Sequence, residues 1–133
     1  MSNRAVKRAL EADTKVRAVK GTNKAAEYRT LALRTSALIR QAGLIQSLTF
    51  LKSRDDKSGA PSQYLNDLAC VSGYGGATAA SQHFDATQKA SDALMYSELV
   101  ERTLSAAEHL HRAVQIHIPA PATPIFAEKG GDK

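Results

Sequence analysis

The feature that most constrains this chain is a jump in helical phase at Gly43. Before it, residues 28–39 carry an apolar stripe at helical spacing: Tyr28, Leu31, Ala32, Thr35, Leu38 and Ile39. After it, a second stripe follows: Leu44, Ile45, Leu48, Phe50 and Leu51. In one straight helix, at about 100° per residue, the two stripes would point in roughly opposite directions. The sequence therefore predicts two helices that meet at a corner, so that both stripes face one core.

Gly43 also has the chemistry of a helix end. At the position after the last helical residue, glycine adopts the left-handed conformation without steric cost, and a Schellman ending then brings Leu44 against Ile39. We expect such an ending here. The alternative is a continuous buried helix that tolerates one glycine in its interior.

The helix after Gly43 has a narrow polar face, formed only by Gln46, Thr49 and Ser53. Because surface helices usually carry a wide charged face, this pattern predicts a helix that is enclosed on most sides. It is then either the central core helix or a core helix that also faces a partner.

The composition favours helices over a sheet. Hydrophobic residues make up 43% of the chain but aromatic residues only 5%, and there is no Trp. A length of 133 residues fits one domain. We predict an all-α fold, a single compact helical bundle of four to six helices over residues 1–118. A Pro-rich tail follows over residues 119–133, which hold three of the four prolines.

The other segments of the bundle are predicted from periodicity, caps and breakers. Residues 1–20 are basic, and a partner can be what orders them. We expect a first helix over residues 4–19, with a thin apolar stripe of Val6, Leu10, Val16 and Val19. A second helix, capped by Thr22 or Asn23, extends to residue 42. After the corner we expect a short helix from about Pro61 to Val71, a flexible loop over residues 72–82 and a closing helix over residues 90–117.

Positive charge is concentrated at one end of the chain. The net charge is +5, yet residues 1–40 hold ten Lys and Arg against three acids, whereas the remainder holds eight against ten. A chain with one basic end is typical of proteins that meet polyanions, most often nucleic acid.

No set of residues indicates a catalytic, metal or cofactor site. Gly73, Gly75 and Gly76 lack the Gly-Lys-Ser/Thr sequence of a phosphate loop. The spacing of the closing histidines does not suit one metal ion. Cys70 lies in an apolar run, which predicts a buried free thiol in a reducing compartment. We therefore expect a protein that is not an enzyme and that needs no metal and no cofactor.

The chain also lacks the patterns of a membrane or exported protein. Its first 20 residues carry charge every few positions, which excludes a signal peptide, and no apolar run approaches the ~18 residues of a membrane span. We expect a soluble, cytoplasmic protein.

The segment "YRTLALRTSALIRQAGLIQSLTFLKSR", residues 28–54, resembles the small subunit of type III-B CRISPR effector complexes, the Cmr family. In that family a Tyr-x-x-Leu-Ala helix leads to a Gly-Leu, a Gln and a Phe-Leu followed by Lys. The segment "YSELVERTLSAAEHLHRAVQIHI", residues 96–118, is similar to the family's last helix. Two positions depart from its pattern: Ala37 replaces a frequent proline, and His109 replaces a frequent Trp.

The resemblance implies a non-catalytic, all-helical RNA-binding subunit of an RNA-guided ribonucleoprotein for antiviral defence. Several copies would stack beside the backbone and other subunits, along guide RNA and target RNA, while other subunits cleave. In such a complex the guide RNA recognises the target sequence by base pairing, so the protein need contact only the RNA backbone. The low aromatic content agrees with this, because it predicts no aromatic platform on which single-stranded bases would stack.

The candidate RNA-binding residues are the cations on the predicted helices around and beyond the corner. They are Lys15, Arg17, Lys24, Arg29, Arg34, Arg40, Lys52, Arg54 and Arg112. Arg40, Lys52 and Arg54 flank the corner and are the strongest candidates.

Two other functions remain open from the sequence. One is the small subunit of a type III-A CRISPR complex, which does a similar job on a similar bundle. The other is a helical adaptor that docks its basic first helix on an acidic protein and binds no nucleic acid.

Overall fold

The computed structural model describes residues 3–120, which form six α-helices and no β-strand. The helices are α1 (Asn3–Val19), α2 (Ala25–Ala42), α3 (Leu44–Ser53), α4 (Ala60–Val71), α5 (Ala79–Lys89) and α6 (Ala93–His117). The predicted all-α class is confirmed, and the number of helices is the upper end of the predicted range.

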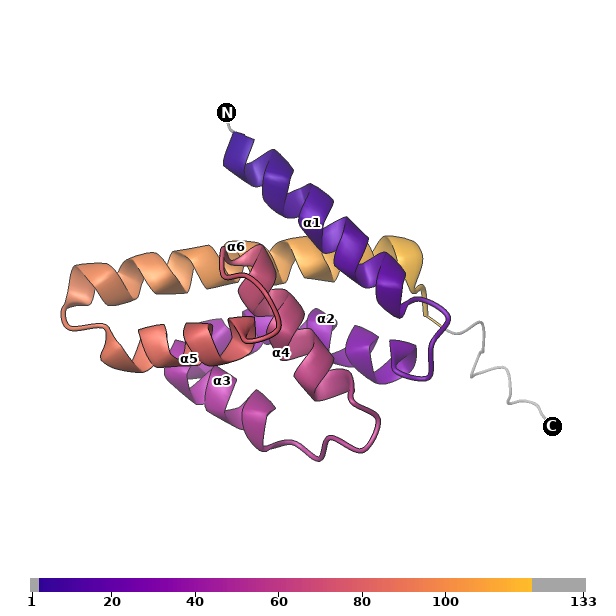
Figure 1. The fold of residues 1–133 in the computed structure, drawn as a ribbon, viewed down its shortest axis with the longest axis horizontal. Coiled ribbons are helices and arrows are strands. Elements are labelled where there is room, and N and C mark those ends of the chain that lie inside the picture. Colours follow the sequence, from indigo (N-terminus) through magenta and orange to yellow (C-terminus); the bar gives the residue numbers. More distant parts are fainter. Residues whose placement is uncertain (1–2, 121–133) are drawn as a thin grey trace.

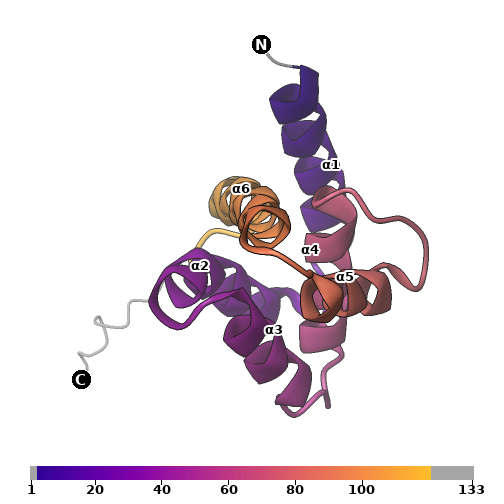
Figure 2. The same ribbon diagram turned by 90° about the vertical axis from the view of Figure 1, so that its left-hand side faces the viewer.

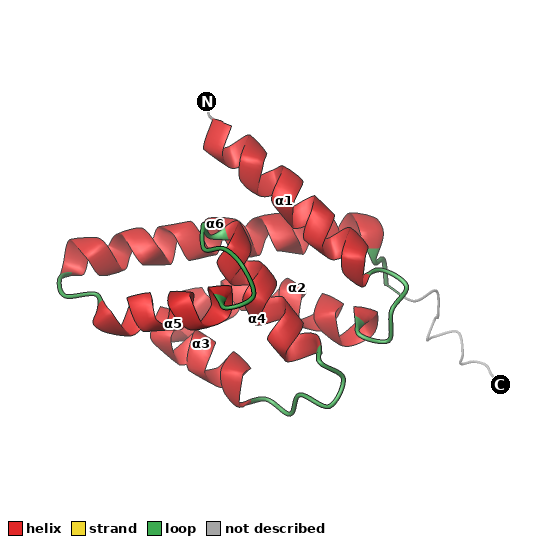
Figure 3. Cartoon of the chain, in the orientation of Figure 1, coloured by secondary structure: helices red, strands yellow, loops and turns green. Residues whose placement is uncertain are grey.

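The longest helix, α6, runs the length of the bundle (Figure 1). Helices α1 and α2 both pack along α6, while α4 contacts α2, α5 and α6. Helix α3 packs against α2, α4 and α5. The N-terminal half of α1 extends beyond the other helices, as the side view shows (Figure 2). Short loops join the successive helices (Figure 3).

The core is built around two tyrosines in contact. The rings of Tyr28 in α2 and Tyr64 in α4 meet edge to face, with centroids 5.5 Å apart and planes at 79°. Tyr28 also donates a 2.6 Å hydrogen bond to the buried carboxylate of Asp67. Fully buried apolar side chains from every helix except α5 complete this core, among them Val16, Leu31, Leu44, Leu68 and Leu110.

The predicted corner at Gly43 is confirmed. Helix α2 ends at Ala42 and α3 begins at Leu44, and Gly43 between them has φ 90° and ψ 163°. The Gly43 N–H donates to the Ile39 carbonyl at 2.9 Å, and the Ser47 N–H donates to the Gly43 carbonyl at 3.1 Å. Both helices therefore keep their backbone bonds up to the corner, and each turns an apolar stripe toward the core.

The predicted Schellman ending is wrong. It requires left-handed helical torsions at Gly43, whereas the observed ψ is extended. The combination of positive φ and extended ψ is open essentially only to glycine. A Cβ added at Gly43 would meet nothing within 4 Å, so the backbone torsion alone requires glycine.

The expectation that α3 is enclosed on most sides is also wrong. Leu44, Leu48 and Leu51 are buried as predicted, but Ile45 is 39% exposed and Phe50 is 48% exposed. Together with exposed Gln46, Thr49 and Ser53 they form a wide solvent face. Of the two alternatives for α3, the central core helix is excluded.

The predicted stripe of the first helix is right in its second half only. Val16 and Val19 are buried, but Val6 and Leu10 are exposed because the start of α1 projects past the bundle. Ala12, which the periodicity did not single out, is buried instead. Helical spacing marks a possible contact face without marking where the neighbouring helix ends.

Helix α5 begins inside the segment that was predicted to be a loop over residues 72–82, and extends past it. Its buried positions are Ala79, His83 and Thr87, which share one face at i, i+4 spacing but include no large apolar residue. The helix therefore leaves no hydrophobic period in the sequence. Only residues 72–78 connect α4 to α5.

Helix boundaries differ from the predictions by a few residues. Helix α2 begins at Ala25, slightly later than predicted, and the Thr22 hydroxyl accepts the Lys24 N–H at 3.2 Å. Helix α6 begins at Ala93, where the Asp92 side chain accepts the Met95 N–H at 2.8 Å and caps the helix.

The predicted Pro-rich tail lies almost entirely outside the described residues, which end at residue 120. The assignment of residues 1–118 as a domain and 119–133 as a tail therefore stays a prediction. Within residues 3–120, no helix is both long and apolar enough to cross a membrane.

Candidate nucleic-acid interface

The nine candidate cations do not converge on one site. Besides Arg54 and Arg112, four of them make a side-chain hydrogen bond or an ion pair within the fold. These contacts are Arg17 with Asp13, Lys24 with Gln63, Arg29 with the carbonyl oxygen of Ile118, and Arg40 with Glu108. The Arg40 contact is a half-exposed ion pair that joins α2 to α6.

Lys15 and Arg112 lie away from the corner. Lys15 is half-buried in α1, and its charge acts on the buried carboxyl of Asp67. Burial raises the pKa of Asp67, whereas hydrogen bonds from Tyr28 and Gln63 and the nearby lysines oppose this rise. Arg112 is exposed on α6, with its Nη1 3.5 Å from His109 Nδ1.

The remaining three cations border the exposed face of α3. Lys52 lies on the side of α5, and its Nζ is 4.4 Å from the centre of the Phe84 ring, a cation–π distance. Arg34 of α2 and Arg54 lie on the side of α2. Between these margins lie the polar side chains of Gln46, Thr49 and Ser53, the seam that the sequence predicted.

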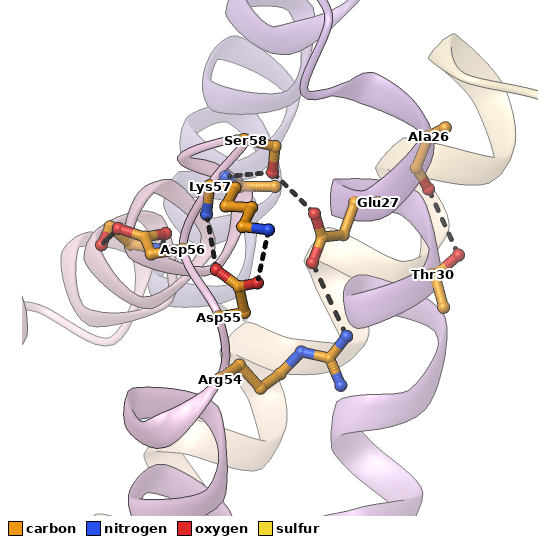
Figure 4. A network of polar contacts seen from close by, with 10 residues as sticks. Ala26, Glu27, Thr30, Arg54, Asp55, Asp56, Lys57 and Ser58 are labelled. Atoms are coloured by element: carbon orange, nitrogen blue, oxygen red, sulfur yellow. Dashed lines mark hydrogen bonds and ion pairs between the residues drawn. The ribbon is translucent and has the colours of Figure 1, made fainter.

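Arg54 is held by a contact to Glu27 of α2 (Figure 4) and by a second contact to Phe50 of α3. Its Nη2 lies 3.6 Å from Glu27 Oε2, at long ion-pair distance, while Glu27 also accepts a 2.6 Å hydrogen bond from the Ser58 hydroxyl. Its guanidinium carbon lies 5.7 Å from the centre of the Phe50 ring. The Arg54 Nε is buried and has no hydrogen-bond partner among the described residues, so the guanidinium is incompletely satisfied.

A groove of about 350 Å³ runs between α2 and α3 beside Arg34 and Arg54. We call it the α2–α3 groove. Its apolar walls include Leu33, Leu38 and Phe50, and no carboxylate is among its lining residues in the described part of the chain. The aromatic residue of this lining is Phe50, which is half-exposed. The corner at Gly43 is what brings the two helices together at this place.

A second, larger groove was not predicted. It has a volume of about 740 Å³ and lies between α1, the loop after α4 and α6. We call it the α1–α6 groove. Its charged lining residues mix four cations with three acids: Arg4, Lys7, Arg8 and Arg102 with Glu11, Glu98 and Glu101. The i, i+3, i+4 spacing of Arg4, Lys7 and Arg8 indicates that they share one face of α1. The α6 residues that line the same groove are almost a hundred positions away in the sequence, so the sequence did not indicate this groove.

The cations of the α1–α6 groove also contact the fold. Arg8 Nη1 donates a 3.1 Å hydrogen bond to the Ser105 hydroxyl, and burial, followed by the charges of Arg4 and Arg102, lowers the pKa of Arg8. The Arg102 side chain lies against Gly73, about 4 Å from where a Cβ would be.

The buried titratable groups have structural partners. His83 Nε2 lies 2.9 Å from the Thr103 hydroxyl, and burial together with the charge of Arg102 lowers the pKa of His83 to about 4. Cys70 is a buried free thiol, as predicted, and burial raises its pKa. His117 bonds Asp13, which lowers the pKa of that carboxyl. Among residues 3–120, no three His, Cys, Asp or Glu residues gather as a metal site.

Comparison with known proteins places the whole bundle in one family. The family model described as "CRISPR-associated protein (Cas_Cmr5)" matches residues 4–117, from the start of α1 to the end of α6. The chain belongs to the Cmr5 family. Membership confirms the resemblance to the small subunit of type III-B complexes and favours it over the type III-A small subunit.

A similar sequence and a similar solved structure, both from Thermus thermophilus, agree with this membership in Cmr5. The chain is 38% identical over 108 residues to "CRISPR system Cmr subunit Cmr5" of Thermus thermophilus, a match that covers 80% of this chain and 89% of the relative. It is also similar to the crystal structure of a CRISPR-associated Cmr5 family protein from Thermus thermophilus. The TM-score is 0.79 at 36% identity, over 89% of this chain and 99% of the other.

Proposed function

We propose that this Cmr5 protein is a non-catalytic, RNA-binding structural subunit of a type III-B CRISPR (Cmr) ribonucleoprotein. Several copies stack along the guide and target RNA beside the backbone and other subunits, and the other subunits cleave. A relative named as a Cmr subunit supports the assembly. The observation that carries the RNA-binding role is the exposed face of α3, a polar seam with cations on both margins.

This face offers what contact with an RNA backbone requires. Lys52 and Arg34 lie on opposite margins and are exposed, so their charges reach solvent. Gln46, Thr49 and Ser53 between them carry amide and hydroxyl groups that donate to phosphate and ribose oxygens. Of the nine candidates, Arg34, Lys52 and Arg54 are therefore the central contacts. Lys15, Arg17, Lys24, Arg29, Arg40 and Arg112 are peripheral, because they lie elsewhere or hold the fold.

Stacking of copies is supported by an apolar end of the molecule. Leu94 is 82% exposed and Met95 is 45% exposed at the start of α6. Ile45 is 39% exposed at the start of α3, and its N–H donates to the hydroxyl of Tyr96, in the first turn of α6, at 3.4 Å. Exposed apolar side chains that gather in one place are typical of surfaces that contact another protein.

The direct test is charge reversal on both margins of the α3 face. We expect Arg34→Glu with Lys52→Glu to lower the affinity of the purified chain for single-stranded RNA about tenfold or more at about 0.1 M salt. The salt slope, log K against log[salt], should become shallower by about 1.4, because each lost phosphate contact on a single strand contributes about 0.7. Binding can be followed by fluorescence anisotropy.

The matched control changes net charge equally at exposed lysines that are neither in α3 nor in the lining of the α2–α3 groove, with Lys20→Glu and Lys89→Glu. The control should keep the salt slope and most of the affinity. Equal losses in both variants would show a nonspecific charge effect and remove the α3 face from the proposal. If the unchanged protein binds no RNA even at low salt, the RNA-binding role is wrong. One copy per reconstituted complex would contradict stacking.

A further inference from the structure

We propose that the α2–α3 groove holds one unpaired nucleotide of a single-stranded RNA, with its base against Phe50 and its phosphate at Arg34 and Arg54. The inference rests on the proposed RNA-binding function and deepens it. Backbone contact alone would treat paired and unpaired RNA alike, whereas a base-holding groove distinguishes them.

Phe50 is the residue that makes this groove more than a charged surface. It is one of three phenylalanines, lies on the solvent side of α3 and is 48% exposed, although its neighbours Leu48 and Leu51 are buried. An exposed aromatic ring gains little from the fold, because burial is the source of its stabilisation. A nucleobase stacked on such a ring contributes about 1–3 kcal/mol and does so for every base.

The charge around Phe50 suits a phosphate. The Arg34 side chain is exposed and makes neither a hydrogen bond nor an ion pair within the described residues. The Arg54 guanidinium already lies over the Phe50 ring, and its contact to Glu27 is long, at 3.6 Å. Because both arginines line a groove without a lining carboxylate, an anion that enters meets two donors and no like charge from the lining.

The size of the groove fits one nucleotide and excludes a duplex. Its volume of about 350 Å³ lies at the small end of the range for ligand pockets, about 300–1,000 Å³. A paired base cannot enter, since its face is covered by its neighbours in the stack. Gln41 at the lining supplies an amide that can both donate to and accept from a base edge.

The other groove does not meet these conditions. The α1–α6 groove is larger and holds four cations, but Glu11, Glu98 and Glu101 share its lining. Its lining ring is Tyr74, which packs against His83 at 5.3 Å between centroids and is therefore engaged in the fold. Of the two grooves, only the α2–α3 groove combines charge with an exposed ring.

The test uses the full chain and two RNA probes of equal length, one single-stranded with 2-aminopurine in place of an adenine, and one double-stranded. For the single strand we expect quenching of the 2-aminopurine fluorescence on binding, and Phe50→Ala should remove the quenching and lower affinity about tenfold. For the duplex, Phe50→Ala should leave the affinity unchanged. Phe50→Tyr keeps a ring and should restore both signals, whereas Phe50→Leu keeps apolar volume and should not.

The outcomes separate this inference from the proposed function. If Phe50→Ala binds the single strand as the unchanged protein does, the groove holds no base, while RNA binding by the α3 face stands. If the unchanged protein binds neither probe, the proposed function itself fails. If Phe50→Ala changes the sedimentation of the free protein and not its RNA affinity, the groove is a contact between copies and the inference is overturned. Because Phe50 is half-exposed, all variants should unfold near the same temperature.

Discussion

The α2–α3 groove and the α1–α6 groove show that the number of cations does not by itself make a binding surface. The α1–α6 groove has twice as many, but Arg8 bonds Ser105, Arg102 lies against Gly73, and three acids share the lining. The α2–α3 groove has only Arg34 and Arg54, without an acid in its lining and beside an exposed ring. The fold therefore engages Arg8 and Arg102, whereas the Arg34 side chain has no partner within the described residues and the ion pair of Arg54 with Glu27 is long, at 3.6 Å.

The difference follows from how each groove is built. The α2–α3 groove depends on a local event, the corner at Gly43, which joins two successive helices. The α1–α6 groove depends on packing between the two ends of the chain, where cations of α1 meet the acids and Ser105 of α6. Substitutions in each groove can therefore separate the charges that stabilise the fold from those that bind RNA.

The largest expected effect is a loss of stability at acid pH that comes from His83, a buried residue near the charge of Arg102 in the α1–α6 groove. The pKa of His83 is lowered to about 4, so between about pH 6.5 and pH 4 the unfolded chain binds a proton that the folded chain does not. This contribution to stability is present above pH 6.5 and is lost as pH falls toward 4. As pH falls over that window, the free energy of unfolding of the unchanged protein, measured with urea, should fall by roughly 3 kcal/mol more than that of His83→Gln.

Arg102→Gln sharpens this test. If the Arg102 charge acts on the fold, removing it should raise the pKa of His83 and make the acid loss shallower, with RNA affinity unchanged. A pH profile of His83→Gln that parallels the unchanged protein would show that His83 is not the group that titrates.

The next effect tests the corner that creates the α2–α3 groove. Gly43→Ala forces a side chain into a backbone conformation that only glycine adopts readily, so we expect a loss of about 1–3 kcal/mol in the free energy of unfolding. Gly75→Ala is the matched control, since Gly75 lies on the edge of the other groove, has no positive φ and has open space around its Cβ. The control should change stability by less than about 0.5 kcal/mol. Equal effects would show that the corner does not depend on glycine.

The smallest effect is expected for RNA binding at the α1–α6 groove. Arg4→Glu with Lys7→Glu removes as much charge as the double change on the α3 face, yet we expect single-stranded RNA affinity to fall less than about threefold, because acids already offset those cations. Anisotropy titrations of the two variants side by side measure the contrast. A larger loss from the α1 pair would reverse the comparison and move the interface to α1.

Local patterns could be predicted from the sequence, and long-range pairings could not. The phase jump at Gly43 predicted the corner because both stripes lie within one stretch of chain. The pairing of Arg40 with Glu108 joins residues 68 positions apart, so the sequence did not indicate that this candidate RNA-binding residue contacts another helix. Helix α5 was missed because Ala79, His83 and Thr87 bury a face without large apolar side chains.

The candidate interface was predictable in part for the same reason. Lys52 and Arg54 were placed at the margins of α3 by helical spacing alone. The exposure of Phe50 depends on the angle between α2 and α3, which the sequence does not contain, and the apolar period of α3 predicted it to be buried. Phe50, which was predicted to lie in the core, therefore lines the α2–α3 groove.

The central claim is that RNA lies on the α3 face of this Cmr5 protein, and photo-crosslinking tests it most directly. A single-stranded RNA with 4-thiouridine at each position in turn would be bound to the full chain, irradiated and mapped by mass spectrometry. The account predicts crosslinks concentrated in α3, with Phe50 among them, and their loss with Arg34→Glu and Lys52→Glu. Crosslinks confined to α1, with none in α3, would contradict it.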